Sequence, residues 1–257
     1  MKRILILGAS LMQMPAIIEA RKLGCYIIAV DANPKAFCVD MVDRFEKYRQ
    51  VLVEYNQHMN LTGITEQREV YIKHFLDSVA IFKNGYIGDG LSVIDVGTGA
   101  GFPGLPFKIC NPNIKLTLLD SLNKRINFLK AVGQELSLDG IDYVHGRAED
   151  MAQKPDHREK YDIATARAVA SLPILLELCV PYVKVGGFFI CLKGPGVDAE
   201  LEDAKNAMKI LGVKLVERID VSLPDQELKH NILVFKKEEP SPAKYPRKAG
   251  KPSKNPL

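Results

Sequence analysis

Short apolar runs alternate along most of the chain with stretches in which apolar side chains recur at helical spacing. The helical stretches include residues 123–132 and 172–183, where apolar positions repeat every three or four residues. The runs between them have the length of buried strands, and they cover residues 93–96, 115–119, 143–145, 161–166 and 188–192. This order predicts an α/β fold with a mostly parallel sheet and helices on its faces.

The last elements depart from this simple alternation. A helix predicted over residues 198–211 precedes two further strands, at 214–218 and 231–236. Pro224-Asp225-Gln226-Glu227 separates those strands, and such a turn favours an antiparallel closing pair. A fully parallel dinucleotide-binding sheet does not predict this pair. Gly186-Gly187 is expected to form the turn that precedes the fifth strand.

Residues 1–40 have a pattern of their own. Residues 2–7 and 26–30 are predicted strands and residues 14–23 a helix, which together make a βαβ half-unit. The stretch resembles the opening of the N-terminal domain of ATP-grasp enzymes of the carbamoyl-phosphate synthase type. No ATP-grasp domain follows, and about forty residues cannot bury a core alone. We interpret this unit as an appended structural piece without a ligand of its own.

Two helices are predicted between residues 41 and 90. The second covers residues 70–79, and His74, Asp77 and Ser78 fall within one of its turns. This group has two interpretations, an acid–base pair or a hydrogen-bonded pair that fixes helix packing. We favour packing, because neither a nucleophile nor a third partner is evident in the sequence.

The most informative stretch is Asp95-Val96-Gly97-Thr98-Gly99-Ala100-Gly101-Phe102-Pro103-Gly104, which predicts the end of a strand, a tight loop and the start of a helix. Two ligands compete for it. A dinucleotide fingerprint can be traced on Gly99, Gly101 and Gly104, but it leaves Gly97 unexplained. An acid-x-Gly-x-Gly-x-Gly pattern that begins at Asp95 fits without slippage. This pattern resembles motif I of class I S-adenosylmethionine methyltransferases, whose loop packs against the methionine part of the cofactor.

Further features indicate an adenosine group. Asp120 ends the strand after the glycine loop, and a carboxylate there can accept hydrogen bonds from both ribose hydroxyls. In the methyltransferase layout, the loop that holds Ala148 and Glu149 passes beside the adenine. Arg167 follows the fourth strand, at the sheet edge where α/β proteins bind ligands.

Composition and charge indicate the cellular location of the protein and suggest a polyanionic partner. The 257 residues are 47% hydrophobic and carry a net charge of +4, and no apolar run approaches the roughly 20 residues of a membrane span. The N-terminus lacks a signal-peptide cleavage pattern, and five cysteines without a C-x-x-C indicate reduced thiols in a cytoplasmic protein. No metal site is predicted. The basic residues of the tail, residues 239–257, are Lys244, Arg247, Lys248, Lys251 and Lys254.

From residue 41 onward the chain resembles the RsmG (GidB) family of small-subunit ribosomal RNA guanine-N7 methyltransferases. The resemblance rests on short stretches in the family's order: 60–62, 73–78, 95–104, 119–121, 146–149, 166–168, 193–194, 247–250 and 252–257. It implies a class I methyltransferase domain at 91–238, preceded by a helical segment at 41–90. The N-terminal part of the chain differs from the family, whose members usually begin with a helical segment where this chain has residues 1–40.

The resemblance implies S-adenosylmethionine as cofactor, 16S ribosomal RNA as partner and a monomeric enzyme. The cofactor contacts that we expect, from the loop and from the resemblance, are Gly97, Gly99, Gly101, Phe102, Asp120, Ala148, Glu149 and Arg167. Arg167 and Lys193 are expected to position the acceptor, and no catalytic acid or base is assigned. The residues expected to bind RNA are Arg147, Lys193, Arg247, Lys248, Lys251 and Lys254.

Two alternatives stay open on the sequence alone. One keeps the cofactor and changes the acceptor to another RNA or to a small molecule, although the basic tail argues against a small acceptor. The other is an RNA-binding module that has lost catalysis through its altered front end. Guanine N7 carries a lone pair and no proton, so its methylation needs mainly proximity and orientation.

Overall fold

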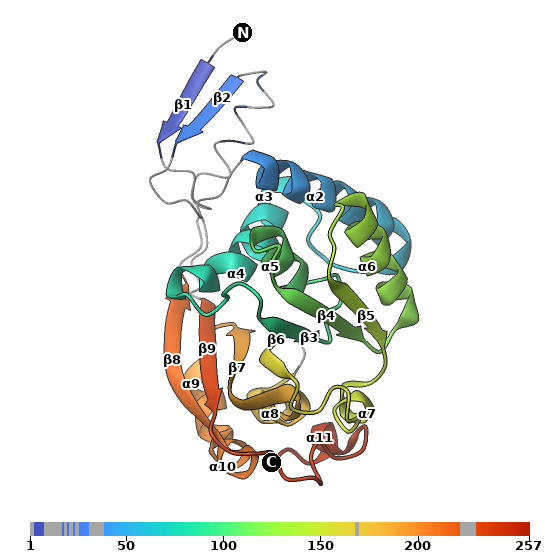
Figure 1. Cartoon of the computed structure of the whole chain (residues 1–257), viewed down its shortest axis with the longest axis vertical. Helices are drawn as coiled ribbons and strands as arrows, with labels where there is room; N and C mark the ends of the chain where they lie inside the picture. The colour runs from blue at the N-terminus through green and yellow to red at the C-terminus, as the bar shows by residue number, and fades with distance from the viewer. Residues whose placement is uncertain are drawn as a thin grey trace.

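The computed structural model describes residues 3–7, 17, 20, 23, 26–30, 39–167, 170–221 and 230–257. Its main sheet has seven strands in the order β5-β4-β3-β6-β7-β9-β8 (Figure 1). The strands are β3 (Ser92–Val96), β4 (Lys115–Asp120), β5 (Ile141–His145), β6 (Tyr161–Arg167), β7 (Val183–Lys193), β8 (Val213–Val221) and β9 (His230–Lys237). Strand β9 runs antiparallel to both of its neighbours, whereas β3 to β7 pair in parallel. The predicted mostly parallel sheet with an antiparallel end is confirmed.

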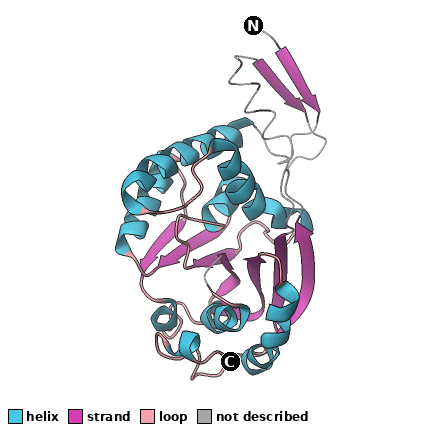
Figure 2. Ribbon diagram, turned by 180° about the vertical axis from the view of Figure 1, so that it is seen from behind, coloured by secondary structure: helices cyan, strands magenta, loops and turns pink. Residues whose placement is uncertain are grey.

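Helices cover both faces of this sheet, so that the domain has three layers (Figure 2). Successive strand residues face opposite sides: Val93 belongs to one buried cluster and Ile94 to the other. Helices α2 (Val39–Met59), α5 (Gly104–Cys110) and α6 (Asn123–Glu135) pack on the first face. The second face carries α7 (Ala148–Met151), α8 (Leu172–Cys179), η4 (Val180–Tyr182), α9 (Val197–Asp203) and α10 (Lys205–Leu211).

The segment before the sheet is helical, as predicted. Helix α2 buries Phe45, Tyr48 and Leu52 completely in the first cluster. A second helical run joins α3 (Gln67–Glu69), the π-helix η2 (Val70–Leu76), α4 (Asp77–Val79) and the 3-10 helix η3 (Ala80–Asn84). The π-helical turn was not predicted, because its apolar spacing resembles that of an α-helix over so short a length.

Two predicted element boundaries are wrong. The helix expected over 198–211 is divided at Ala204, and the bend keeps both α9 and α10 against α8. Gly186 and Gly187 lie inside β7 instead of before it. They accommodate a bulge there: Gly186 has φ +87°, and a Cβ on Gly187 would lie 2.5 Å from the Asp162 carbonyl oxygen.

Strands β1 (Arg3–Leu7) and β2 (Tyr26–Val30) pair in parallel as a separate two-stranded sheet, which confirms both predicted strands. Of the helix predicted over 14–23, the structure describes only three positions. Ile17 and Ala20 are helical and buried, and Ile17 joins the first core cluster. The rest of that helix lies outside the described residues. Over the described ranges, no helix has the length and apolar character that crossing a membrane requires.

The C-terminal tail lies along the second face as a strap with one short helix, α11 (Lys251–Lys254). The Arg158 guanidinium donates to the carbonyl oxygens of Ser241 and Tyr245, at 2.9 and 2.8 Å. Arg247 holds the tail to α8: its guanidinium donates to both carboxylate oxygens of Glu177, at 2.9 and 2.6 Å. The backbone N–H of Arg247 also donates to Glu177 Oε1, at 2.8 Å. The Glu177 side chain is fully buried, so this pair fixes where the tail runs.

Arg247→Ala is expected to lower the free energy of unfolding by about 3–5 kcal/mol, because it leaves a buried carboxylate without its counter-charge. Denaturant titration measures the loss. The double variant Arg247→Met, Glu177→Leu is expected to recover most of it. Lys205→Ala, which removes the exposed pair with Glu202, is the control and is expected to cost less than about 1 kcal/mol. Equal losses for the two single variants would contradict the assignment.

Candidate functional site

The glycine loop is closed by a buried acid at the end of β3. Oδ2 of Asp95 accepts hydrogen bonds from Thr98 Oγ1 at 2.7 Å and from the Gly104 N–H at 2.9 Å. The carboxylate therefore ties the first turn of the loop to the start of α5. Asp95 is fully buried, and this burial raises its pKa to about 6.

The loop needs its glycines for two different reasons. Gly97, Gly99 and Gly101 have φ of +69°, +60° and +98°, a region that disfavours side chains. Gly104 instead needs close packing, since a Cβ there would lie 2.8 Å from Asp95 Oδ2. The three positive-φ positions are those of the acid-x-Gly-x-Gly-x-Gly pattern. Tyr48 of α2 fixes the loop from outside by donating to the Ala100 carbonyl oxygen at 2.5 Å.

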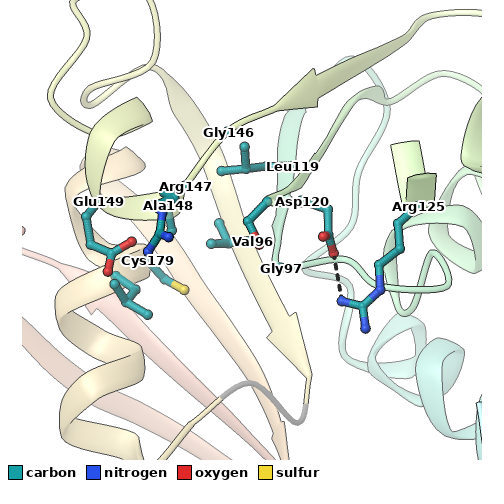
Figure 3. A pocket seen from close by; sticks show the side chains of 12 residues that line it. Val96, Gly97, Leu119, Asp120, Arg125, Gly146, Arg147, Ala148, Glu149 and Cys179 are labelled. Atoms are coloured by element: carbon teal, nitrogen blue, oxygen red, sulfur yellow. Dashed lines mark hydrogen bonds and ion pairs between the residues drawn. The ribbon is translucent and has the colours of Figure 1, made fainter. Parts of the chain in front are cut away.

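A first cavity of about 350 Å³ opens at the carboxyl ends of β3, β4 and β5 (Figure 3). Five residues predicted for the site line it: Gly97, Asp120, Arg147, Ala148 and Glu149. Sequence reasoning missed the wall that α8 provides through Leu178 and Cys179, together with Val96, Leu119, Ser121, Arg125 and Gly146. Gly99, Gly101, Phe102 and Arg167 are not among the lining residues, so their predicted cofactor contacts remain predictions.

Asp120 connects β4 to the glycine loop. Its Oδ2 accepts from the Gly99 N–H at 2.9 Å and from Arg125 Nη1 at 3.4 Å, which Figure 3 marks with a dashed line. Its Oδ1 accepts from the Leu122 N–H at 2.9 Å. A carboxylate has about four lone-pair sites, so it can still accept from a ligand hydroxyl at the cavity wall.

A second cavity of about 370 Å³ lies at the ends of β6 and β7. Arg167 and Lys193, both predicted for the site, line it together with Ile64, Lys73, His74, Asp77, Leu192, Gly194, Glu200 and His230. Phe102 of the glycine loop reaches this side: its ring centroid lies 4.6 Å from that of His74 and 4.7 Å from Arg167 Cζ. The loop thus lines the first cavity through Gly97 and contacts residues of the second through Phe102.

The Arg167 guanidinium forms hydrogen bonds with the π-helical segment. Its Nη1 donates to the carbonyl oxygens of Lys73 and His74 at 3.2 and 3.4 Å, and it lies 3.5 Å from Asp77 Oδ2. Lys73 and His74 belong to the π-helix η2, so this arginine donates to the backbone of that segment. Burial lowers the pKa of Arg167, and Asp77 opposes that effect. Arg167 therefore positions the segment that forms one wall of the second cavity.

His74 is a neutral residue with a defined tautomer. Arginine can only donate, so the contact of 3.2 Å from Arg167 Nη2 makes His74 Nδ1 the acceptor. The ring proton is then on Nε2 and is donated to Thr62 Oγ1 at 2.8 Å. Burial, followed by the charge of Arg167, lowers the pKa of His74 to about 4. This geometry supports the packing interpretation of His74 over an acid–base role.

Sequence reasoning missed Lys73, Glu200 and His230 among the ionisable residues of the second cavity. His230 Nδ1 lies 3.1 Å from Asp77 Oδ1, and this hydrogen bond raises the pKa of His230. Glu200 lies 2.6 Å from Lys193 Nζ. A signal existed for His230: β9 is antiparallel, so its first residue lies at the edge where the parallel strands end. Glu200 gave no such signal, because it sits within a helix.

The residues predicted to bind RNA have different surroundings. Arg147 is exposed beside the first cavity, and Lys248, Lys251 and Lys254 are exposed on the tail. Arg247 is held by Glu177, and Lys193 is only 10% exposed because Glu200 and the Ala170 carbonyl oxygen hold its ammonium group. Arg147, Lys248, Lys251 and Lys254 are thus exposed to a phosphate backbone, whereas Arg247 and Lys193 already use part of their donors within the fold.

Comparison with known proteins supports one family. The sequence model of GidB, described as rRNA small subunit methyltransferase G, matches residues 41–228. The ribosomal RNA small subunit methyltransferase G of Alkaliphilus oremlandii is 52% identical over 246 residues, which cover 96% of this chain and 100% of that protein. The protein of the same name from Clostridium botulinum strain Loch Maree is 47% identical over 234 residues, 91% of this chain and 96% of that protein.

Among solved structures, a mutant of MtNAS in complex with S-adenosylmethionine matches with a TM-score of 0.51 and 14% identity, over 77% of this chain and 73% of that chain. This likeness concerns the fold alone. The Alkaliphilus oremlandii match leaves at most 11 of the 257 residues outside it, so it extends into residues 1–40. These matches give no support to the resemblance of residues 1–40 to ATP-grasp enzymes.

We expect ¹⁵N NMR to show the His74 ring neutral, with its proton on Nε2, down to about pH 5. In the unfolded chain the ring takes up a proton near its ordinary pKa of 6.5. The folded protein therefore binds fewer protons between about pH 6.5 and 4, and its stability falls as the pH falls through this window. The expected loss is about 2–3 kcal/mol at the lower end.

The matched comparison uses two variants, each followed by denaturant titration at several pH values. His74→Gln is expected to lose this part of the pH dependence, whereas His58→Gln, at an exposed position of α2, is expected to keep it. Identical pH profiles for wild type and His74→Gln would show that His74 is not held neutral.

Proposed function

The chain belongs to the GidB family of rRNA small subunit methyltransferase G proteins, and from this premise we propose that it methylates N7 of a guanine in 16S ribosomal RNA. The protein is an S-adenosylmethionine-dependent methyltransferase. One observation carries the assignment of the site: the acid-tied glycine loop lines one cavity through Gly97, beside Asp120, and through Phe102 contacts two residues of a second cavity that is lined by ion pairs. The remaining steps follow the chemistry of those two cavities.

The first cavity fits an adenosyl sulfonium. Gly97 presents no side chain, and Asp120 supplies a carboxylate for ribose hydroxyls. Ala148 and Glu149 begin α7, so their N–H groups lack helical partners and can meet the adenine edge. Leu178 and Cys179 would cover the base from α8. When bound, S-adenosylmethionine supplies an electrophilic methyl group.

The second cavity suits the acceptor base. The Phe102 ring of the glycine loop stacks on His74 of this cavity, and Arg167 fixes the helical wall to which His74 belongs. Guanine N7 attacks with its in-plane lone pair and loses no proton, so no general base is required. The neutral, fully engaged His74 ring agrees with such a reaction. Catalysis would then come mainly from holding N7 and the methyl group in line.

The RNA backbone would be held outside the cavities. Arg147 lies exposed at the rim of the first cavity, and the tail lysines 248, 251 and 254 extend the positive surface. Basic side chains attract RNA independently of its sequence, and an exposed base is then read by shape and stacking. The proposal includes the small ribosomal subunit as the setting, a cytoplasmic location and a monomeric enzyme.

Incubation with S-adenosylmethionine labelled in its methyl group tests the reaction on 30S particles, naked 16S ribosomal RNA and transfer RNA. Mass spectrometry of the digested RNA is expected to find the label as 7-methylguanosine in small-subunit RNA. Label in another nucleoside, or only in transfer RNA, would contradict the acceptor. Titration calorimetry with the cofactor is the companion measurement, and RNA binding without cofactor binding would indicate a non-catalytic RNA-binding module.

The tail contributes through charge. Replacing Lys248, Lys251 and Lys254 by Gln is expected to weaken RNA binding and to make the dependence of log K on log salt shallower by about 0.7 for each phosphate that the tail no longer neutralises. Fluorescence anisotropy at several salt concentrations measures both. The control replaces three other exposed lysines, 205, 209 and 214, of α10 and β8. An equal effect in both triple variants would mean that the tail has no special role.

A further inference from the structure

Glu200 presents an open carboxylate oxygen at the second cavity. The side chain lines this cavity and is 31% exposed. Its Oε2 lies 2.6 Å from Lys193 Nζ and accepts from the Leu172 N–H, at the start of α8, at 2.8 Å. Among the described residues, Oε1 has no hydrogen-bond partner. Two contacts on one oxygen thus hold the carboxylate in place and leave the other available to a ligand.

Asp77, the other carboxylate of the cavity, has a partner at each of its two oxygens. Asp77 is only 5% exposed, its Oδ1 meets His230, and its Oδ2 meets Arg167. The ammonium group of Lys193 is shared between Glu200 and the Ala170 carbonyl oxygen. Among the described residues that line the cavity, Glu200 is therefore the carboxylate that has an oxygen without a hydrogen-bond partner.

Guanine has the complementary edge. Its N1–H and 2-amino groups are donors, and they lie on the opposite side of the base from N7. If N7 is directed at the methyl group beside the glycine loop, the donor edge is directed away from the loop, toward lining residues of other elements, of which Glu200 on α9 is one. Adenine presents an acceptor at N1 and carries no 2-amino group, so a carboxylate in that place discriminates between the two purines.

Resting on the proposed function, we propose that Glu200 accepts hydrogen bonds from the N1–H and 2-amino groups of the acceptor guanine, with Oε1 as the open acceptor. Glu200 would then determine the specificity for guanine.

The same contact would assist the transfer itself. As the N7–methyl bond forms, the methyl–sulfur bond breaks and its electron pair stays on sulfur. The positive charge of the sulfonium passes to the purine ring, and no proton leaves during the step. A carboxylate on the donor edge therefore interacts more strongly with the transition state than with neutral guanine. Lys193, paired with Glu200, keeps that carboxylate oriented.

The test crosses an enzyme variant with a substrate variant. Splinted ligation produces 16S ribosomal RNA with either guanosine or inosine at the methylated position, since inosine keeps N7 and N1–H but lacks the 2-amino group. Wild type is expected to lose roughly 10-fold or more in kcat/KM on inosine. Glu200→Gln is expected to show a much smaller ratio, about 3-fold or less. Glu202→Gln, an exposed position on the same helix, should keep the wild-type ratio.

The ratio of guanosine to inosine within each variant cancels any general damage to folding or to the Lys193 pair. Glu200→Asp keeps the charge, shortens the side chain and serves where Glu200→Gln folds poorly or is too slow to assay; it too must shrink the ratio. An unchanged ratio in these variants, or no inosine penalty in wild type, overturns the role of Glu200. Failure of wild type to methylate guanine N7 overturns the proposed function instead.

Discussion

The arrangement of the site depends on the contacts that the Arg167 guanidinium makes. It bonds to carbonyl oxygens of the π-helical segment, pairs with Asp77 and lies over the Phe102 ring. One side chain at the end of β6 therefore joins the sheet, the helical wall and the glycine loop. Two of the carbonyl oxygens that it contacts, those of Lys73 and His74, belong to the π-helix, so the arginine holds this segment through its backbone.

Charge in the second cavity is balanced by pairs: Arg167 with Asp77, Lys193 with Glu200, and Lys73 with Glu69. Buried pairs contribute less to stability than their number indicates, because each charge must first be removed from water. In this cavity the pairs fix the orientation of the charged side chains. A cavity of paired charges also suits a reaction that moves one positive charge from sulfur to the base, since neither state faces an excess of like charge.

The tail connects the surface that we propose to bind RNA to the first cavity. Arg247 is bound to Glu177, and the next two residues of α8, Leu178 and Cys179, line the place proposed for the cofactor. The tail thus has two kinds of basic residue. Arg247 stabilises the fold, whereas the lysines at 248, 251 and 254 are exposed and are those that we propose to bind RNA. Composition alone could not separate them, because the distinction depends on a carboxylate 70 residues earlier in the chain.

The sequence by itself determined the order of the elements, through short apolar runs, an acid at the tip of β3 and of β4, and three glycines between. Those local signals predicted the α/β sheet and the lining residues Gly97 and Asp120, because a strand end and the loop that follows it carry their chemistry in consecutive positions. The resemblance to methyltransferases added Ala148 and Glu149. Only the tertiary structure decided which distant side chains meet there. The partners of Arg167 come from a segment more than 90 residues away in the case of His74, and His230 reaches Asp77 across 153 residues. Such contacts depend on how helices and an antiparallel strand pack at one sheet edge, and neither periodicity nor motif spacing records that packing.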